Sequence, residues 1–435
     1  MKVTSARWAA LDVLRDVRRG ELADRALARA LERVAARDRP WTQELVYGTF
    51  RLRGRLDFML DQLVRRGIAS LDPDVLDILR LGAYQLLEMG SVPVYAAVSQ
   101  AVEMTKKVAG KGAGGLVNGV LHSLSRRRGE LEFPEPATDP VGYLSTWGSH
   151  PRWLVERWVR RYGAEAARTL VEANNTRPEL FVRPLRIELT EAEARLAAAG
   201  IEARRVPFAP DALRVMPPAT ALDALAAVPA IVQDPAAGLV VRYAAVPEGA
   251  LIADLCAAPG GKALELAERA RYAVAADVSF GRMGRVRENA DRVGGMPLGL
   301  VVADARWPPL REVDVVLLDV PCTGTGTLRR HPDGKWRLGP MDLPALTELQ
   351  REILEAGAAR VRPGGLLVYS TCSLEPEENE EQVDAFLDRH PEFELEPTPA
   401  GTVSAELLDE AGRLVVLPQA TGVDGAFAAR LRRKD

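Results

Sequence analysis

The stretch Val315–Trp336, VVLLDVPCTGTGTLRRHPDGKW, decides the fold of the chain. Its apolar run followed by Asp319 predicts a buried parallel strand, because such strands are apolar on both faces. Ligands of parallel sheets bind at the carboxyl ends of the strands. Pro321 stiffens the exit of this strand, and the glycines that follow let the backbone approach a ligand closely. We therefore expect a reaction site here with Cys322 at its mouth, although a buried structural cysteine is the alternative for that residue taken alone.

From about residue 228 onward, apolar strand-like segments alternate with amphipathic helical ones. This alternation predicts a doubly wound α/β domain with a parallel sheet. The segments are ALIADLC, KALELAERA, YAVAAD, GRMGRVRENADRV, LGLVVADA, VDVVLLDV, LTELQREILEAGAARV and GGLLVYSTCS.

Acidic residues close several of these strands, in positions that suit a nucleoside cofactor. Asp254 precedes a small-residue turn, CAAPGGK, whose backbone amides can approach a ligand. Asp277 ends the next strand, where a carboxylate can bind ribose hydroxyls, and Asp304 is placed to meet an adenine edge. The turn lacks the GxGxxG pattern of dinucleotide enzymes, so S-adenosylmethionine is the better prediction. One acid at a strand end is often only a helix cap, but three in succession are harder to explain that way.

A second cysteine, Cys372, follows the apolar strand LLVYST, and we expect the sheet to bring it to the same mouth as Cys322. Carbon 5 of a pyrimidine is a poor nucleophile, so a thiolate must first add to carbon 6. One cysteine can make that addition, and the other can help to remove the carbon 5 proton and release the enzyme.

The N-terminal part, residues 1 to about 130, is expected to be an all-α bundle. Its segments carry apolar residues at three- and four-residue spacing between Gly, Pro and Asp breaks, and Asp72-Pro73 is typical of a helix start. Exposed helix edges are the simpler explanation for its basic residues, although they also suit a phosphate-binding surface. These residues are Arg51, Arg53, Arg55, Lys106, Lys107 and Arg126–Arg128.

A proline-rich acidic linker, ELEFPEPAT, separates the bundle from residues 139–227. There, an aromatic and basic helical stretch precedes strands and one helix, which predict a small α/β module resembling an RRM. Tryptophans such as Trp158 can stack on RNA, but at helical spacing they are more often core residues. The expected domains are thus 1–130, 139–227 and 228–435.

Composition sets further limits on the function. The chain has 435 residues, a formal net charge of −3 and three cysteines, too few for a disulfide framework. With four histidines and no HxxxH spacing, we expect no metal. The first part of the chain is net basic and the rest net acidic, an asymmetry that hints at a nucleic-acid partner, although Arg-rich solvated helix faces explain the charge equally well. No apolar run approaches the length of a membrane span and no signal peptide is evident, so we expect a cytoplasmic protein without membrane contact, and a monomer.

The motifs LCAAPGGK, LLDVPCTGTGTLRRHPDGKW and YSTCSLEPEENEEQV resemble those of the RNA (cytosine-5-)-methyltransferases. The segments ELVYGTFRLRGRLDFML, LRLGAYQLLEMGSVPVYAAVSQAVEMTKK and GLVNGVLHSL resemble the RNA-binding domain of the NusB antitermination factor. Together they resemble the bacterial Sun/RsmB-type enzymes that methylate 16S ribosomal RNA. This resemblance implies a class I, Rossmann-like methyltransferase domain after a NusB-like bundle.

The resemblance also implies roles for individual residues. Cys372 is the nucleophile, Cys322 assists release, and Asp319 holds ring nitrogen 3 of the base or lies against the cofactor. The opposite assignment of the cysteines, by analogy with DNA cytosine methyltransferases, stays open. The residues implied in cofactor binding are Cys256, Ala257, Ala258, Pro259, Gly260, Gly261, Lys262, Asp277, Asp304 and Asp319. Arg329, Arg330, His331 and Lys335 suit contacts with RNA phosphates and a flipped-out base, with a solvated basic loop as the alternative.

This sequence departs from the family pattern at a few positions. Val320 and Thr323 replace the usual Ala and Ser, and Ala426 replaces an aromatic residue. The expected activity is methylation of carbon 5 of a cytosine in 16S ribosomal RNA, free or in an assembling small subunit. Methylation of transfer RNA and a non-catalytic RNA-binding or antitermination-like role are the alternatives.

Overall fold

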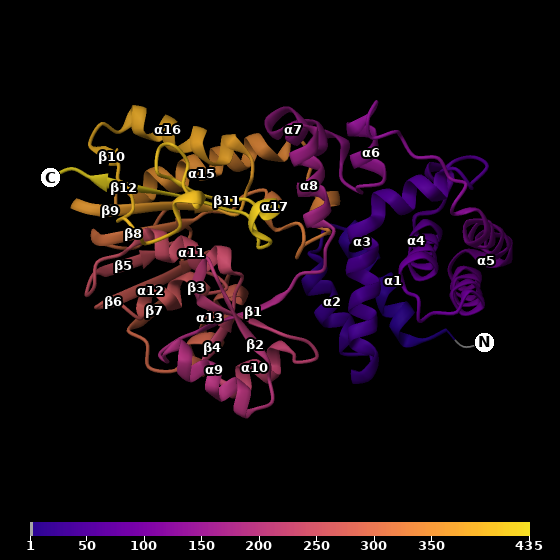
Figure 1. The fold of residues 1–435 in the computed structure, drawn as a ribbon, viewed down its shortest axis with the longest axis horizontal. Helices are drawn as coiled ribbons and strands as arrows, with labels where there is room; N and C mark the ends of the chain where they lie inside the picture. The colour runs from indigo at the N-terminus through magenta and orange to yellow at the C-terminus, as the bar shows by residue number, and fades with distance from the viewer. Residues whose placement is uncertain (1–2) are drawn as a thin grey trace. The chain divides into compact units, whose positions relative to one another are not determined.

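The computed structural model describes residues 3–435, which form two compact units (Figure 1). Among the described residues, the first unit consists of residues 3–176 and 328–340, and the second of residues 177–327 and 341–435. The stretch 315–336 is thus divided between the two units. Its basic, aromatic end belongs to the first unit, and its cysteine loop belongs to the second.

The N-terminal part of the first unit is the helical bundle that the periodicity predicts. Its helices are α1 (Ser5–Arg18), α2 (Ala23–Leu31), α3 (Arg39–Asp61), α4 (Pro73–Glu88) and α5 (Val94–Arg127). Leucine, valine and alanine side chains from all five helices form one continuous buried core. The Asp72 carboxylate accepts hydrogen bonds from the first turn of α4, and Pro73 opens that helix, as the sequence predicts. Gly110 interrupts α5 with a φ of 87°, which divides it into two helical stretches.

Three further helices belong to this unit: α6 (Pro140–Thr146), α7 (Arg152–Tyr162) and α8 (Ala164–Asn174). Trp158 on α7 is 1% exposed, so it is a core residue and not an RNA-stacking one. The segment 328–340 carries the short helix α14 (Gly334–Arg337).

The second unit begins with a four-stranded antiparallel sheet in the order β2-β3-β1-β4. Its elements are β1 (Leu180–Pro184), α9 (Leu189–Ala198), β2 (Ala203–Val206), β3 (Ala209–Val215), α10 (Ala221–Ala227) and β4 (Ala230–Val232). This is the βαββαβ arrangement of ferredoxin-like folds. The small α/β module is therefore confirmed, but the sequence analysis missed α10 and β4. The short strand β4 lies beyond the expected boundary at residue 228, next to the alternating pattern of the larger domain.

The larger sheet has the strand order β10-β12-β9-β8-β5-β6-β7, with β11 paired to β12. Its strands are β5 (Leu251–Asp254), β6 (Tyr272–Asp277), β7 (Leu298–Val302), β8 (Val313–Asp319), β9 (Val361–Thr371), β10 (Phe393–Leu395), β11 (Leu414–Val416) and β12 (Ala426–Arg433). The five strands from β7 to β9 are parallel, β12 runs antiparallel to β9, and β10 pairs antiparallel with β12. The doubly wound sheet is thus confirmed, and its strand order reverses direction between β5 and β8, where such sheets bind ligands.

Helices cover both faces of this sheet (Figure 1). They are α11 (Pro235–Ala244), α12 (Gly261–Ala267), α13 (Phe280–Val293), α15 (Asp342–Ala358), α16 (Glu380–Arg389) and the short α17 (Pro418–Thr421). Alternate residues of β8 point to opposite faces: Val315 and Leu317 pack in the core with α11, whereas Val316 and Leu318 pack with α15 and α16. The 3₁₀ helices are η1 (Ala36–Asp38), η2 (Ile68–Ser70), η3 (Thr325–Thr327), η4 (Pro376–Glu378) and η5 (Ala405–Leu407).

The structure has two compact units, whereas three domains, 1–130, 139–227 and 228–435, were predicted from the sequence. We retain these three segments as a proposal for the modules of the chain. Within residues 3–435, no helix is both long and apolar enough to cross a bilayer. The same residues contain no cluster of three or more His, Cys, Asp or Glu side chains that could hold a metal ion.

Candidate active site

A cavity of about 410 Å³ lies at the carboxyl ends of β5, β6 and β8 in the second unit. This volume is in the range of small-molecule sites. Predicted site residues that line the cavity are Cys256, Ala258, Asp277, Asp304, Asp319, Cys322 and Cys372. Of the remaining predicted cofactor residues, Ala257, Pro259 and Gly260 lie in the loop after β5, and Gly261 and Lys262 open α12; none of these residues lines the cavity.

The loop after β5 is held against the end of β6. Ala257 donates a backbone hydrogen bond to the Ala276 carbonyl (2.9 Å), and the Ala258 N–H donates to the Asp277 carboxylate (3.3 Å). Gly260 has a φ of 107°, and a Cβ there would lie 3.0 Å from a Val286 side-chain carbon on α13. The glycine is therefore required by the turn and by the close packing of α13.

Two carboxylates of the cavity have different surroundings. Asp277 is 4% exposed, and its second oxygen accepts the Ser279 N–H at 2.8 Å, so it joins the two loops after β5 and β6. Asp304 instead makes a close pair with Arg306 (2.7 Å), and that hydrogen bond lowers the pKa of Asp304. Both groups present acceptor oxygens to the cavity, beside apolar side chains of Val278, Ala305 and Ile353.

This combination fits the cofactor that the sequence predicts. Carboxylate oxygens suit ribose hydroxyls, and the apolar lining suits the face of an adenine ring. The residues present are therefore compatible with S-adenosylmethionine in this cavity.

Asp319, at the end of β8, is held by two donors. The Lys262 ammonium lies 2.8 Å from one oxygen, and the Ser370 hydroxyl donates to the other at 2.9 Å. Burial acts to lower the pKa of Lys262, but the charge of Asp319 and its hydrogen bond outweigh it, so the pKa is raised. Lys262 therefore fixes Asp319 rather than lining the cofactor cavity, a role that the sequence analysis did not assign.

The sulfur atoms of Cys322 and Cys372 lie 3.4 Å apart. They come from the tips of neighbouring parallel strands, since Asp319 on β8 is paired with Ser370 on β9. Both cysteines are free and partly exposed, and both line the cavity. The expectation that the sheet brings the two cysteines to one mouth is confirmed.

The two sulfurs interact with different charged groups. The hydrogen bond with Cys372 and then burial raise the pKa of Cys322 well above its ordinary value, and the Glu378 charge acts in the same direction. In contrast, a charge on Cys372 raises the pKa of Lys262. By reciprocity, the Lys262 ammonium stabilises negative charge on the Cys372 sulfur. Cys322 is thus favoured as a thiol, whereas Cys372 interacts with the Lys262 ammonium, which is itself paired with Asp319.

Hydrogen bonds between buried groups connect the loop after β8, which carries Cys322, with the loop after β9, which carries Cys372. The Glu378 carboxylate accepts the Thr323 N–H at 2.8 Å and the Gln350 side-chain amide at 2.9 Å. The hydroxyls of Thr323 and Ser373 lie 3.0 Å apart across the two loops. Thr323 replaces the usual Ser of the family and retains a hydroxyl group, which makes the contact with Ser373. Glu378 was not predicted as a site residue, because the acidic run EPEENEE has the composition of a solvated helix start.

Two glycines allow the loops to approach each other. The Gly326 N–H donates to the Cys372 carbonyl (2.9 Å), and the Gly425 N–H donates to the Gly326 carbonyl (2.7 Å). A Cβ at Gly326 would lie 2.7 Å from both the Cys372 carbonyl oxygen and the Gly425 Cα. The turn Gly422–Gly425, with the sequence GVDG, thus packs behind the cysteine loop, whereas Ala426 is buried at the start of β12.

The predicted RNA contacts after this loop need correction. Lys335 is completely buried in the first unit, and its ammonium donates to the Asn175 side chain (2.7 Å) and to backbone carbonyls, including that of Arg51 (3.2 Å). The prediction of an RNA contact is therefore wrong for Lys335, which joins its segment to the bundle. Arg329 is also buried at 7% exposure, which argues against a direct contact there. Arg330 is half-buried, and His331 is exposed beside Asp24 (3.2 Å).

Asp254 leads to a prediction about stability. It is 2% exposed, and one of its oxygens has no hydrogen-bond partner among residues 3–435. Burial and then the Asp319 charge raise the pKa of Asp254 from 3.8 to about 7. The folded protein therefore holds this proton more tightly than the unfolded chain does, so the free energy of unfolding falls as the pH rises from about 4 to about 7.

We expect Asp254→Asn to remove this penalty, because an amide stays neutral and keeps an oxygen to accept the Cys256 N–H. Thermal unfolding should show the variant a few degrees or more above the parent protein at pH 8, with a difference that shrinks towards pH 4. A difference that is the same at both pH values would contradict the assigned ionisation.

Three family models match the chain. A model described as 16S rRNA methyltransferase RsmB/F matches residues 243–432, and the NusB family model matches residues 4–126. A model of the ferredoxin-like domain of RsmF/B-like methyltransferases matches residues 150–221. The resemblances seen in the motifs are therefore confirmed.

Full-length relatives agree with these models. The ribosomal RNA small subunit methyltransferase B of Salmonella arizonae is 36% identical over 98% of both chains. The probable ribosomal RNA small subunit methyltransferase B of Bacillus subtilis is 34% identical over 100% of both chains. The crystal structure of a protein named PH0851 covers 100% of both chains, with a TM-score of 0.81 and 26% sequence identity. The chain therefore belongs to the RsmB/F family of 16S rRNA methyltransferases, enzymes that depend on S-adenosylmethionine.

Proposed function

We propose that the protein transfers a methyl group from S-adenosylmethionine to carbon 5 of a cytosine in 16S ribosomal RNA. The observation that carries this proposal is the contact of 3.4 Å between the Cys322 and Cys372 sulfurs beside a carboxylate-lined cavity. The cofactor supplies an electrophilic methyl group. The remaining chemistry, activation of carbon 5 and removal of its proton, falls to residues of this chain.

We assign the nucleophilic attack to Cys372. Its thiolate adds to carbon 6 of the cytosine, and the electron pair of the carbon 5–carbon 6 double bond is then available at carbon 5 for attack on the methyl group. The Lys262 ammonium favours this thiolate, whereas Glu378 disfavours a thiolate on Cys322. These surroundings support Cys372 over the opposite assignment.

Cys322 completes the reaction in this scheme. The largest cause of its raised pKa is the hydrogen bond with Cys372, and that cause disappears once the Cys372 sulfur is bonded to carbon 6. Cys322, which is partly exposed in the cavity wall, can then give its own proton to solvent water and, as a thiolate, take the proton from carbon 5. The electron pair of the broken C–H bond re-forms the double bond and expels the Cys372 thiolate.

Asp319 is placed to hold the base. It lines the cavity beside both cysteines, and its orientation is fixed by Lys262 and Ser370. Ring nitrogen 3 becomes more basic when a thiolate adds to carbon 6, and a carboxylate can accept the hydrogen bond from the protonated nitrogen. We assign cofactor binding to Asp277, for the ribose, and to Asp304, for the adenine edge, together with the Cys256–Lys262 loop.

The physiological substrate in this proposal is 16S ribosomal RNA or an intermediate in small-subunit assembly. Such a substrate places the enzyme in the cytoplasm, where we expect it to act as a monomer.

Transfer of tritium from labelled S-adenosylmethionine tests the proposal. We expect label in 5-methylcytosine of unmodified small-subunit ribosomal RNA, and none with a Cys372→Ala control. Label in transfer RNA but not in ribosomal RNA would contradict the substrate. Binding of ribosomal RNA without any transfer would contradict the enzymatic role and favour a binding factor.

A further inference from the structure

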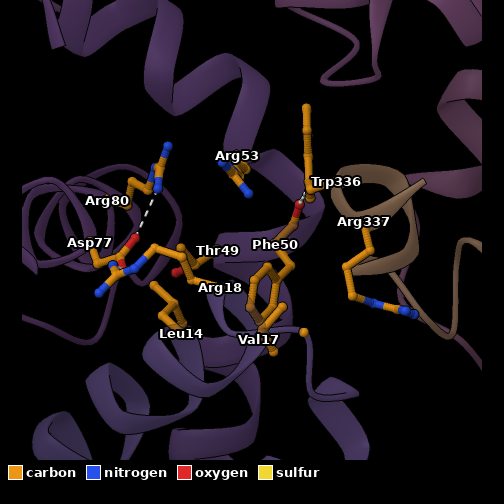
Figure 2. A pocket seen from close by; sticks show the side chains of 11 residues that line it. Leu14, Val17, Arg18, Thr49, Phe50, Arg53, Asp77, Arg80, Trp336 and Arg337 are labelled. Carbon is orange, nitrogen blue, oxygen red and sulfur yellow. Dashed lines mark hydrogen bonds and ion pairs between the residues drawn. The ribbon is translucent and has the colours of Figure 1, made fainter. Parts of the chain in front are cut away.

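The first unit contains a cavity of about 450 Å³ that the methyl-transfer scheme does not use (Figure 2). It is formed by helices α1, α3 and α4 of the bundle and by the end of the segment 328–340. The residues that line it are Leu14, Val17, Arg18, Gly20, Thr49, Phe50, Arg53, Asp77, Arg80, Trp336 and Arg337. Four arginines and a single carboxylate thus share this cavity with aromatic and aliphatic side chains.

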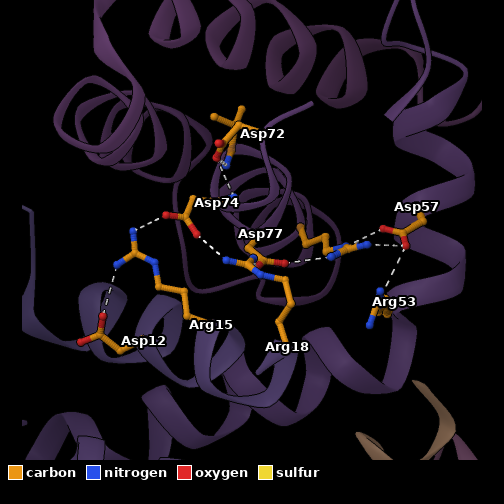
Figure 3. A network of polar contacts seen from close by, with 10 residues as sticks. Asp12, Arg15, Arg18, Arg53, Asp57, Asp72, Asp74 and Asp77 are labelled. Atoms are coloured by element: carbon orange, nitrogen blue, oxygen red, sulfur yellow. Dashed lines mark hydrogen bonds and ion pairs between the residues drawn. The ribbon is translucent and has the colours of Figure 1, made fainter. Parts of the chain in front are cut away.

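Carboxylates hold two of these arginines in place (Figure 3). Arg80 donates to both oxygens of Asp57 (2.7 and 2.8 Å) and to Asp77 (2.8 Å). Arg18 donates to Asp74 at 2.6 Å and also pairs with Asp77. Because these contacts fix the guanidinium groups before any ligand arrives, binding an anion here costs little side-chain entropy. Asp77, the only carboxylate in the lining, is itself neutralised by the two arginines.

Arg53 lies in the same cavity with much weaker pairing. Its closest carboxylate oxygen, on Asp57, is 3.6 Å away, and its buried Nε has no hydrogen-bond partner among residues 3–435. Burial and then the charge of Arg80 lower the pKa of Arg53. A guanidinium in such surroundings gains from an additional anion, because the anion offsets both the lost hydration and the repulsion.

Two aromatic side chains, Phe50 and Trp336, line the same cavity as the arginines. The Trp336 indole donates from Nε1 to the Phe50 carbonyl at 2.6 Å, and a Cβ at Gly54 would lie 2.9 Å from the indole ring. The ring is therefore fixed tightly on α3, with the Arg53 guanidinium 5.3 Å from its centre. In Figure 2, Trp336 and Phe50 lie on one side of Arg53, and Arg80 with Asp77 on the other.

An anion held next to a planar apolar group is the chemistry of a nucleotide. We propose that this cavity binds one unpaired nucleotide of the RNA substrate, with its phosphate at Arg53 and its base against Trp336. The proposal rests on the proposed function, because it takes RNA as the substrate. The base must be unpaired, since a base within a helix cannot present its face to an aromatic ring.

Fluorescence anisotropy with the full-length protein and a labelled single-stranded RNA oligonucleotide of mixed sequence tests this site. We expect Arg53→Gln to weaken binding several-fold at low salt. The slope of log K against log salt concentration should also fall by about 0.7, the value for one lost phosphate contact on a single strand. Arg53→Lys should keep most of the slope, because it keeps the charge.

Arg37→Gln is the matched control, since Arg37 belongs to the same unit, lies outside the cavity and has an 88% exposed side chain. It should leave the affinity close to that of the parent protein. Equal affinities and equal salt slopes for Arg53→Gln and Arg37→Gln, with both variants folded by circular dichroism, would overturn the proposal.

Photo-crosslinking of the unaltered protein gives an answer that does not depend on how variants fold. RNA containing 4-thiouridine should crosslink to peptides that carry Trp336 or Phe50. Crosslinks confined to other peptides would overturn the proposal.

Tritium transfer to ribosomal RNA by the same preparation separates the two claims. Transfer with no effect of Arg53→Gln on binding refutes only the nucleotide site, whereas binding through this cavity without transfer refutes only the enzymatic function.

Discussion

Replacement of Cys372 by alanine should abolish methyl transfer, whereas replacement of Cys322 by alanine should leave a stable covalent complex between protein and RNA. The first variant lacks the thiolate that adds to carbon 6, so its activity should fall by roughly 10³-fold or more. The second variant keeps that thiolate but lacks the sulfur 3.4 Å away that is assigned to remove the carbon 5 proton. The adduct should therefore form and persist.

A denaturing gel of each variant with RNA and S-adenosylmethionine reads out this difference as a slowly migrating band. The band should appear with Cys322→Ala and not with Cys372→Ala. If the Cys372 variant accumulates the band instead, the roles of the two cysteines are reversed, as in the analogy with DNA cytosine methyltransferases.

Replacement of Gly326 by alanine should lower the turnover number by about 100-fold. The added Cβ would lie 2.7 Å from the Cys372 carbonyl oxygen and from the Gly425 backbone, so the loop must move. A displacement of about 1 Å at a reacting group can cost about 10²-fold in rate. Single-turnover methylation at saturating RNA measures this effect.

Gly284→Ala is the matched control, because it adds the same atom in the same unit, on α13, with no heavy atom within 4 Å of the new Cβ. It should leave the turnover number unchanged. Normal activity of Gly326→Ala would show that the loops tolerate a change of spacing, contrary to the fixed contact between them.

The elements that could be predicted from the sequence are those with strong apolar periodicity or with a motif at the end of a strand. The bundle helices, the parallel strands and the meeting of Cys322 with Cys372 follow from apolar spacing and from the rule that strand ends gather at one edge. The strand β4 was missed because three residues, Ala230–Val232, are too short to show a period. The helix α10, with seven residues, is similarly short.

The site residues that sequence reasoning misplaced depend on tertiary packing. Lys335 looked like a basic loop residue, but burial against carbonyl oxygens decides its role, and no local pattern shows that burial. Glu378 was given no role from the sequence, yet it is buried and its carboxylate accepts the Thr323 N–H. Lys262 belongs to a recognisable turn, but its pairing with Asp319 depends on strands β5 and β8 being neighbours.

The most direct test of the central claim is to locate the covalent bond itself. RNA with 5-fluorocytidine at the methylated position has no carbon 5 proton to lose, so the reaction should stop after methyl transfer with the enzyme still attached. Mass spectrometry of the digested complex should find the modified nucleotide on the peptide that contains Cys372. Attachment to the peptide that contains Cys322, or no attachment under conditions where the natural RNA is methylated, would contradict the account.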